Sequence, residues 1–187
     1  MSKYSSHLAA LIFLACALAC KLRVVDLPTN FALFGALSIF CGAYLRGFAA
    51  WGIPLFGIVV GDFLGDRLGV SGVHRYGFQS MLFTYTGFAA MIGVGHLLRL
   101  RDSIESVLGT AIAGSVAFYL ISNFGSWLNP LMNYDRSPSG LLACYWAGIP
   151  FFKYTFLSDV LFTLAFVGAN RLALANAPQS ANAPVDR

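Results

Sequence analysis

Charged residues are so sparse in this chain that they separate it into long apolar runs. Of the 187 residues, 11% are charged, against about 25% in soluble domains, and 58% are hydrophobic. A soluble globule of this composition would lack enough polar side chains to cover its surface. The composition therefore predicts a protein whose main solvent is the lipid bilayer. It excludes a disordered chain, a nucleic-acid-binding domain and an ordinary soluble enzyme.

The few cationic side chains and the cysteines fit the same interpretation. The formal net charge is +4, but the Lys and Arg residues stand singly between apolar runs and form no basic block. They are typical of residues that anchor helix ends at lipid headgroups, so no nucleic-acid partner is expected. The four cysteines lie inside apolar runs without a CxxC pair or a histidine cluster. We therefore expect no metal and no cofactor.

The apolar runs predict an all-α integral membrane bundle of six transmembrane helices. A span needs about 20 apolar residues, and the runs place the spans at roughly 6–25, 31–45, 48–66, 78–98, 104–127 and 155–174. Pro150 and Lys153 divide the last long stretch, which predicts a short interfacial or re-entrant helix over 140–151 before the last span. Asp102 or Ser103 fits the N-cap of the fifth span. Residues 1–175 then form the transmembrane domain, with a polar loop at 68–77 and a disordered tail at 176–187.

The first apolar run has a second interpretation, as a signal peptide that ends near Cys20. The run continues past Lys21 and Arg23 into two valines, which favours a retained helix. Six spans place both termini on one side of the membrane. Six Lys or Arg residues then lie on each side, so the positive-inside rule chooses neither orientation, although net charge favours cytoplasmic termini.

Polar residues within or beside the spans collect at the membrane face opposite the termini. Charges inside spans are costly and usually face a cavity or a partner. Asp62 and Asp66 share one helix face at i,i+4 spacing, and Lys153 is the expected counter-ion for the acidic residues. We expect a pocket for a small solute, in which carboxylates and amides fix polar groups while Trp127 and Tyr145 stack on a planar part. The predicted solute-binding residues are Asn30, Asp62, Asp66, Asn123, Trp127, Tyr145, Lys153 and Asp159.

Each of these residues also has a purely structural interpretation. Asp66 with Arg67 can form a solvated helix end, and Asp159 can be an anion that stabilises a helix N-terminus. Asn123 can join two helices by a hydrogen bond, and the tryptophans can anchor the protein in the membrane interface. Only their gathering at one face favours a binding site.

The sequence carries no catalytic motif of the GxSxG, HExxH or P-loop kind and no nucleophile–base pair in the spans, so we do not expect an enzyme. Without a nucleotide-binding segment the chain does not hydrolyse ATP itself. The alternative to solute binding is a structural or accessory subunit of a larger membrane complex. In that case an internal ion pair, such as Lys153 with an aspartate, would satisfy the polar cluster and leave no cavity.

Several stretches between about residues 28 and 172 together resemble DUF6580, a family of small bacterial membrane proteins. The stretches that carry the resemblance are Asn30–Leu37, Gly42–Arg46, Asp62–Gly65, Ser122–Trp127, Gly140–Phe152 and Thr155–Asp159. Members of that family look like the substrate-binding (S) components of energy-coupling-factor (ECF) vitamin transporters. No vitamin-specific signature accompanies these stretches, so the ligand stays open.

The resemblance implies six helices in the bacterial inner membrane, cytoplasmic termini and a site for a vitamin-like solute near the outer face. It also implies partners, namely a transmembrane coupling subunit and ATPase subunits. Small residues at Ala15 and Ala19 on the first span are the expected docking positions for the coupling subunit.

Overall fold

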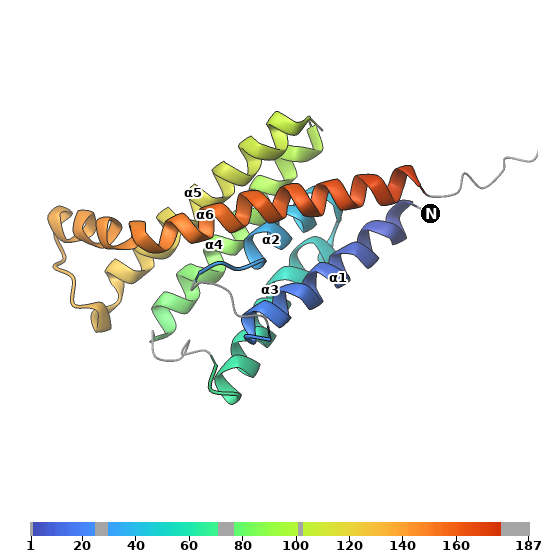
Figure 1. The fold of residues 1–187 in the computed structure, drawn as a ribbon. Coiled ribbons are helices and arrows are strands. Elements are labelled where there is room, and N and C mark those ends of the chain that lie inside the picture. Colours follow the sequence, from blue (N-terminus) through green and yellow to red (C-terminus); the bar gives the residue numbers. More distant parts are fainter. Residues whose placement is uncertain (1, 25–29, 71–76, 101–102, 177–187) are drawn as a thin grey trace, which may run out of the picture.

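The computed structural model describes residues 2–24, 30–70, 77–100 and 103–176, and these ranges contain helices and no strand (Figure 1). The expected all-α class is therefore confirmed for them. The expected tail and most of the expected 68–77 loop lie outside the described residues. The elements are α1 (Ser2–Lys21), α2 (Phe34–Tyr44), α3 (Phe48–Arg67), α4 (Gly77–Leu97), η2 (Leu98–Leu100), α5 (Ile104–Leu128), η3 (Pro130–Met132) and α6 (Pro138–Ala175).

Three of the described helices, α3, α5 and α6, are long and apolar enough to cross a membrane. The expectation of six spans is not confirmed. Helix α2 has 11 residues and is therefore about 16 Å long, roughly half of the ~30 Å hydrocarbon core. It lies at the centre of the bundle instead, where every residue from Phe34 to Gly42 is buried.

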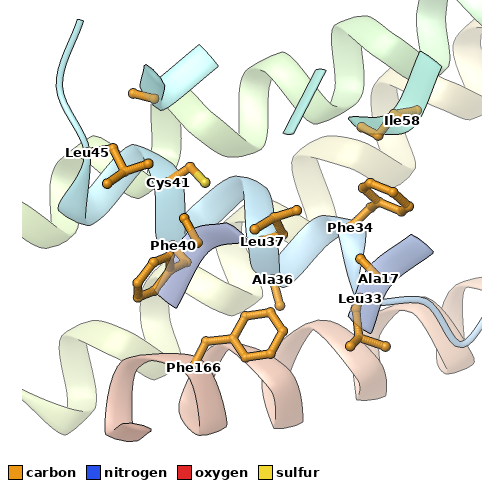
Figure 2. Packing of buried hydrophobic residues seen from close by; sticks show 12 residues of the cluster. Ala17, Leu33, Phe34, Ala36, Leu37, Phe40, Cys41, Leu45, Ile58 and Phe166 are labelled. Atoms are coloured by element: carbon orange, nitrogen blue, oxygen red, sulfur yellow. The ribbon is translucent and has the colours of Figure 1, made fainter. Parts of the chain in front are cut away.

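The core of the molecule forms around α2 because this helix is apolar on all sides. It contacts α1, α3, α4, α5 and α6. Figure 2 shows its side chains, among them Leu37 and Phe40, between Ile58 of α3 and Phe166 of α6. Phe166 also stacks on Phe13 of α1, with ring centroids 3.9 Å apart. The short helix therefore joins the longer ones into one packed unit.

Helices α2 and α4 approach closely at two glycines. A Cβ on Gly42 would lie 2.2 Å from the carbonyl oxygen of Ile92, and a Cβ on Gly95 would lie 2.4 Å from that of Ile39. Such contacts exclude any side chain at either position, and small residues are the usual means of bringing helix backbones together in membrane proteins.

Each end of α2 is accompanied by a charged side chain from another element. At the C-terminal end, Arg99 of η2 donates from Nε to the carbonyls of Gly42 (2.8 Å) and Ala43 (3.1 Å), and from Nη2 to that of Leu45. At the N-terminal end, the carboxylate of Asp159 lies against Gly35. A cation at the C-terminus and an anion at the N-terminus both complement the helix dipole.

Helix α6 runs without interruption from Pro138 to Ala175, so the expected break at Pro150 and Lys153 was wrong. A proline removes one backbone hydrogen bond, but packing can keep a helix together around it. Tyr119 of α5 does so here, since its hydroxyl donates to the carbonyl of Tyr145 before Pro150. Its ring also packs on that of Phe152 after Pro150, with ring centroids 4.5 Å apart. At 38 residues, α6 is about 57 Å long.

Candidate functional site

A cavity of about 560 Å³ lies between the helices and is partly open to the outside. This volume falls within the range of small-molecule sites. Helix α4 contributes one face, with Ser80, Thr84 and Tyr85 among its lining residues. Helix α5 contributes Phe118, Ser122, Asn123 and Ser126, and α6 contributes Cys144, Ala147, Gly148 and Phe151. In each helix these positions are three or four residues apart or adjacent, so each set forms one face.

The cavity wall combines hydroxyl and amide groups with apolar side chains. The hydroxyl and amide groups belong to Ser80, Thr84, Tyr85, Ser122, Asn123, Ser126, Tyr134 and Asn30. Burial, followed by the neighbouring Cys144, raises the pKa of Tyr134 in the loop after η3, so its hydroxyl stays a neutral donor. A few polar groups among apolar side chains are the usual lining of small-molecule sites.

An ion pair closes one side of the cavity. Lys21, the last residue of α1, places Nζ 2.5 Å from Oδ1 of Asp62 on α3. Tyr85 of α4 donates its hydroxyl to Oδ2 of Asp62 at 2.7 Å. The lysine stem crosses α3 at Gly61, where a Cβ would lie 2.7 Å from Lys21 Cδ. Three helices therefore meet at one buried carboxylate, whose charge is compensated within the chain.

Three of the eight predicted site residues line the cavity: Asn30, Asp62 and Asn123. Asn30 is exposed and has a left-handed backbone with φ 67°, and its carbonyl accepts from Thr155 of α6 at 3.3 Å. The Asn123 amide donates to the carbonyl of Tyr119 at 2.9 Å. A smaller cavity of about 130 Å³ shares Asn30 and Asn123 with the main one, so the two form neighbouring lobes.

The other five, Asp66, Trp127, Tyr145, Lys153 and Asp159, do not line either cavity. Lys153 is exposed and its ammonium lies 4.8 Å from the ring centre of Tyr154. The expected counter-ion role of Lys153 is taken by Lys21, because the continuous α6 directs Lys153 outward. Asp66 is half-buried near the end of α3.

The two aromatic residues expected to stack on a solute have partners within the chain. Trp127 Nε1 donates to the carbonyl of Asp135 at 2.8 Å, and the guanidinium of Arg136 lies 5.6 Å from its ring centre. Tyr145 donates its hydroxyl to the carbonyl of Leu120 at 3.0 Å. Trp127 therefore connects the end of α5 to the segment before α6, and Tyr145 connects α5 to α6.

Asp159 is 1% exposed and lies inside the bundle. Its Oδ2 accepts from the hydroxyl of Ser115 on α5 at 2.7 Å, and its Oδ1 faces Gly35 in the first turn of α2. A carboxylate in this position supports the helix N-terminus. The structural interpretation of an anion at a helix end therefore fits Asp159, although the helix is α2 rather than α6.

The residues that sequence reasoning missed are chiefly Lys21 and Tyr85, together with the hydroxyl pairs Ser80 with Thr84 and Ser122 with Ser126. Both pairs have i,i+4 spacing inside apolar helices, which is a usable signal for a polar face. Lys21 gave no such signal, because a lysine at the end of an apolar run usually anchors the helix at the headgroups.

The two predicted docking positions lie on α1. Ala15 is exposed and Ala19 is half-buried on α1, and their role in docking stays a prediction. In the part of the chain that the structure describes, no three His, Cys, Asp or Glu side chains gather as metal ligands.

Comparison with known proteins yields one match. The model of a family described as "Family of unknown function (DUF6580)" matches residues 2–181. No curated protein and no solved structure matches the chain.

Proposed function

Since the chain belongs to DUF6580, a family of unknown function, we propose from its geometry that it is a solute-binding integral membrane protein. The cavity of about 560 Å³ carries this proposal. Hydroxyl and amide groups of α4 and α5 line this partly open cavity beside apolar side chains, which is the usual composition of a small-molecule site.

The finer proposal is that the chain is the substrate-capture component of an ECF-type uptake transporter in the bacterial inner membrane. It then has six membrane helices and cytoplasmic termini, and the cavity lies near the outer face. Capture alone does not drive uptake, so a transmembrane coupling subunit and ATPase subunits supply the energy. The exposed Ala15 and the half-buried Ala19 on α1 are the proposed contact with the coupling subunit.

The alternative, a structural or accessory subunit, requires a filled bundle in which the polar groups satisfy one another. The Lys21–Asp62 ion pair agrees with that requirement, but the cavity beside it does not. Solute binding accounts for both features, and we therefore prefer it.

The proposal is tested by thermal unfolding of the purified protein in detergent with a panel of vitamins and their precursors. We expect at least one compound to raise the melting temperature, because a ligand that binds only the native state stabilises it. Thr84→Trp, which fills the cavity, should abolish that shift. Thr86→Trp, on the exposed side of the same helix, should preserve it.

Two results would count against solute binding. One is a panel without any shift, together with the absence of a co-purifying small molecule. The other is a shift that Thr84→Trp leaves unchanged, since the compound would then bind elsewhere.

A further inference from the structure

The Lys21–Asp62 ion pair restricts the charge of any molecule that enters the cavity. Among the described lining residues, these two carry the charges, and they neutralise each other at 2.5 Å. Their side chains are 23% and 8% exposed and both line the cavity, although Oδ1 of Asp62 is itself buried. An ionic solute would leave a net charge in a surrounding of low dielectric constant, which is costly. The pair therefore favours a solute without net charge.

The same pair offers a hydrogen-bond donor directly beside an acceptor. An ammonium group has three N–H donors, and the contact with Asp62 uses one of them. Oδ1 of Asp62 is buried beside Lys21, so the acceptor position left to a solute is on Oδ2, which also accepts from Tyr85. A solute that meets this wall with an N–H next to a C=O makes both bonds at once.

The apolar part of the lining fits a flat ring. Phe88 of α4 and Phe118 of α5 both face the cavity, with ring centroids 4.7 Å apart. Ile58, Met81 and Met132 add aliphatic and thioether surface. Aromatic faces bind other rings by stacked or edge contacts, and methionine adapts to irregular shapes.

From these observations, and resting on the proposed function, we infer the substrate class. The solute is an uncharged planar heterocycle with a ring amide, whose N–H binds Asp62 and whose C=O binds Lys21. The side-chain oxygens of Ser122, Ser126 and Asn123 on the facing helix accept from its other polar substituents, because their own donors bond to carbonyls within α5.

Two purine derivatives test this inference on the wild-type protein. Theobromine has one ring N–H between two carbonyls, and caffeine differs from it only by a methyl group on that nitrogen. We expect theobromine to bind the purified protein at least about tenfold more tightly than caffeine in equilibrium dialysis, as two-point recognition of a ring edge provides elsewhere. Equal binding of the two compounds would overturn the inference.

Variants test whether the preference for theobromine over caffeine depends on the Lys21–Asp62 ion pair. Asp62→Asn should reduce the preference for theobromine to less than about threefold, and Lys153→Gln, on an exposed lysine outside the cavity, should retain it. If Asp62→Asn does not fold, the wild-type comparison decides alone. An unchanged preference in folded Asp62→Asn would overturn the inference.

The outcomes also separate this inference from the proposed function. Free tryptophan, a zwitterion with a ring, serves as the contrasting probe. If tryptophan or another compound of the vitamin panel binds in the cavity and theobromine does not, the substrate class is wrong and solute binding stands. If no compound binds, both are wrong.

Discussion

Asp159 and Gly35 are in such close contact that a Cβ on Gly35 would lie 2.0 Å from Oδ1 of Asp159. Because glycine has no side chain, the first turn of α2 can approach the carboxyl group on α6. In return, the carboxyl group of Asp159 lies beside the first turn of α2, at a helix N-terminus that is buried. This contact fixes where α2 begins relative to α6, and it explains a buried aspartate without assigning it to the cavity.

Gly35→Ala should therefore destabilise the protein. Overpacking of this kind costs about 1–3 kcal/mol, which exceeds the helix-propensity gain of about 0.5–1 kcal/mol on replacing glycine with alanine. Gly168→Ala on α6 is the matched control, because a Cβ there meets no atom within 4 Å. Thermal unfolding followed by circular dichroism in detergent measures both. Equal melting temperatures for the two variants would contradict the contact.

The crossing of α2 and α4 gives a second prediction. Gly95→Ala should lower the melting temperature by separating the two backbones, at a cost of about 1–3 kcal/mol. Gly93→Ala lies two residues away on the same helix, where a Cβ would meet open space, and it should be neutral or slightly stabilising. A Gly93→Ala variant as unstable as Gly95→Ala would show that the crossing has no special role.

The C-terminal end of α2 gives a third prediction. Arg99→Gln should lose about 1–2 kcal/mol of stability, since hydrogen bonds from a charged donor to three backbone carbonyls are removed from a partly exposed site. Arg46→Gln, at an exposed neighbouring arginine, serves as the control. Hydrogen exchange of the α2 amides localises the effect. We expect faster exchange there in Arg99→Gln alone.

The ion pair gives a fourth prediction, about stability rather than binding. Lys21→Met leaves the Asp62 carboxylate buried without its cation and should cost about 1–3 kcal/mol, below the value for fully buried pairs because Lys21 is partly exposed. The double variant Lys21→Met/Asp62→Leu should recover part of that loss, because no unpaired charge remains. Additive losses in the double variant would show that the two side chains are not coupled.

Charge spacing and hydropathy predicted the all-helical class and the approximate positions of the helices, because these are local properties. Local sequence predicted an N-cap at Asp102 or Ser103, and the structure shows Ser103 there, since its hydroxyl accepts from the backbone N–H of Ser106 at 3.2 Å. Of the residues predicted to gather at one end, Asn30, Asp62 and Asn123 line one cavity, and their role in binding stays a prediction.

The errors concern contacts between distant parts of the chain. Pro150 does not end a helix because Tyr119, 31 positions earlier, contacts both sides of it. Lys153 was the expected counter-ion for the acidic residues, yet the cation at Asp62 is Lys21 of α1. Asp159 was assigned to the pocket because the position of Gly35 cannot be inferred from local sequence.

The support at both ends of α2 has a consequence for biogenesis. This helix is synthesised second, but the residues that complete its ends, Arg99 and Asp159, follow it by more than 50 and more than 110 positions. Since 11 residues are too short to span a bilayer alone, α2 acquires its final surroundings only after η2 and α6 have been synthesised. The order in which the ribosome delivers the helices is therefore not the order in which they finish folding.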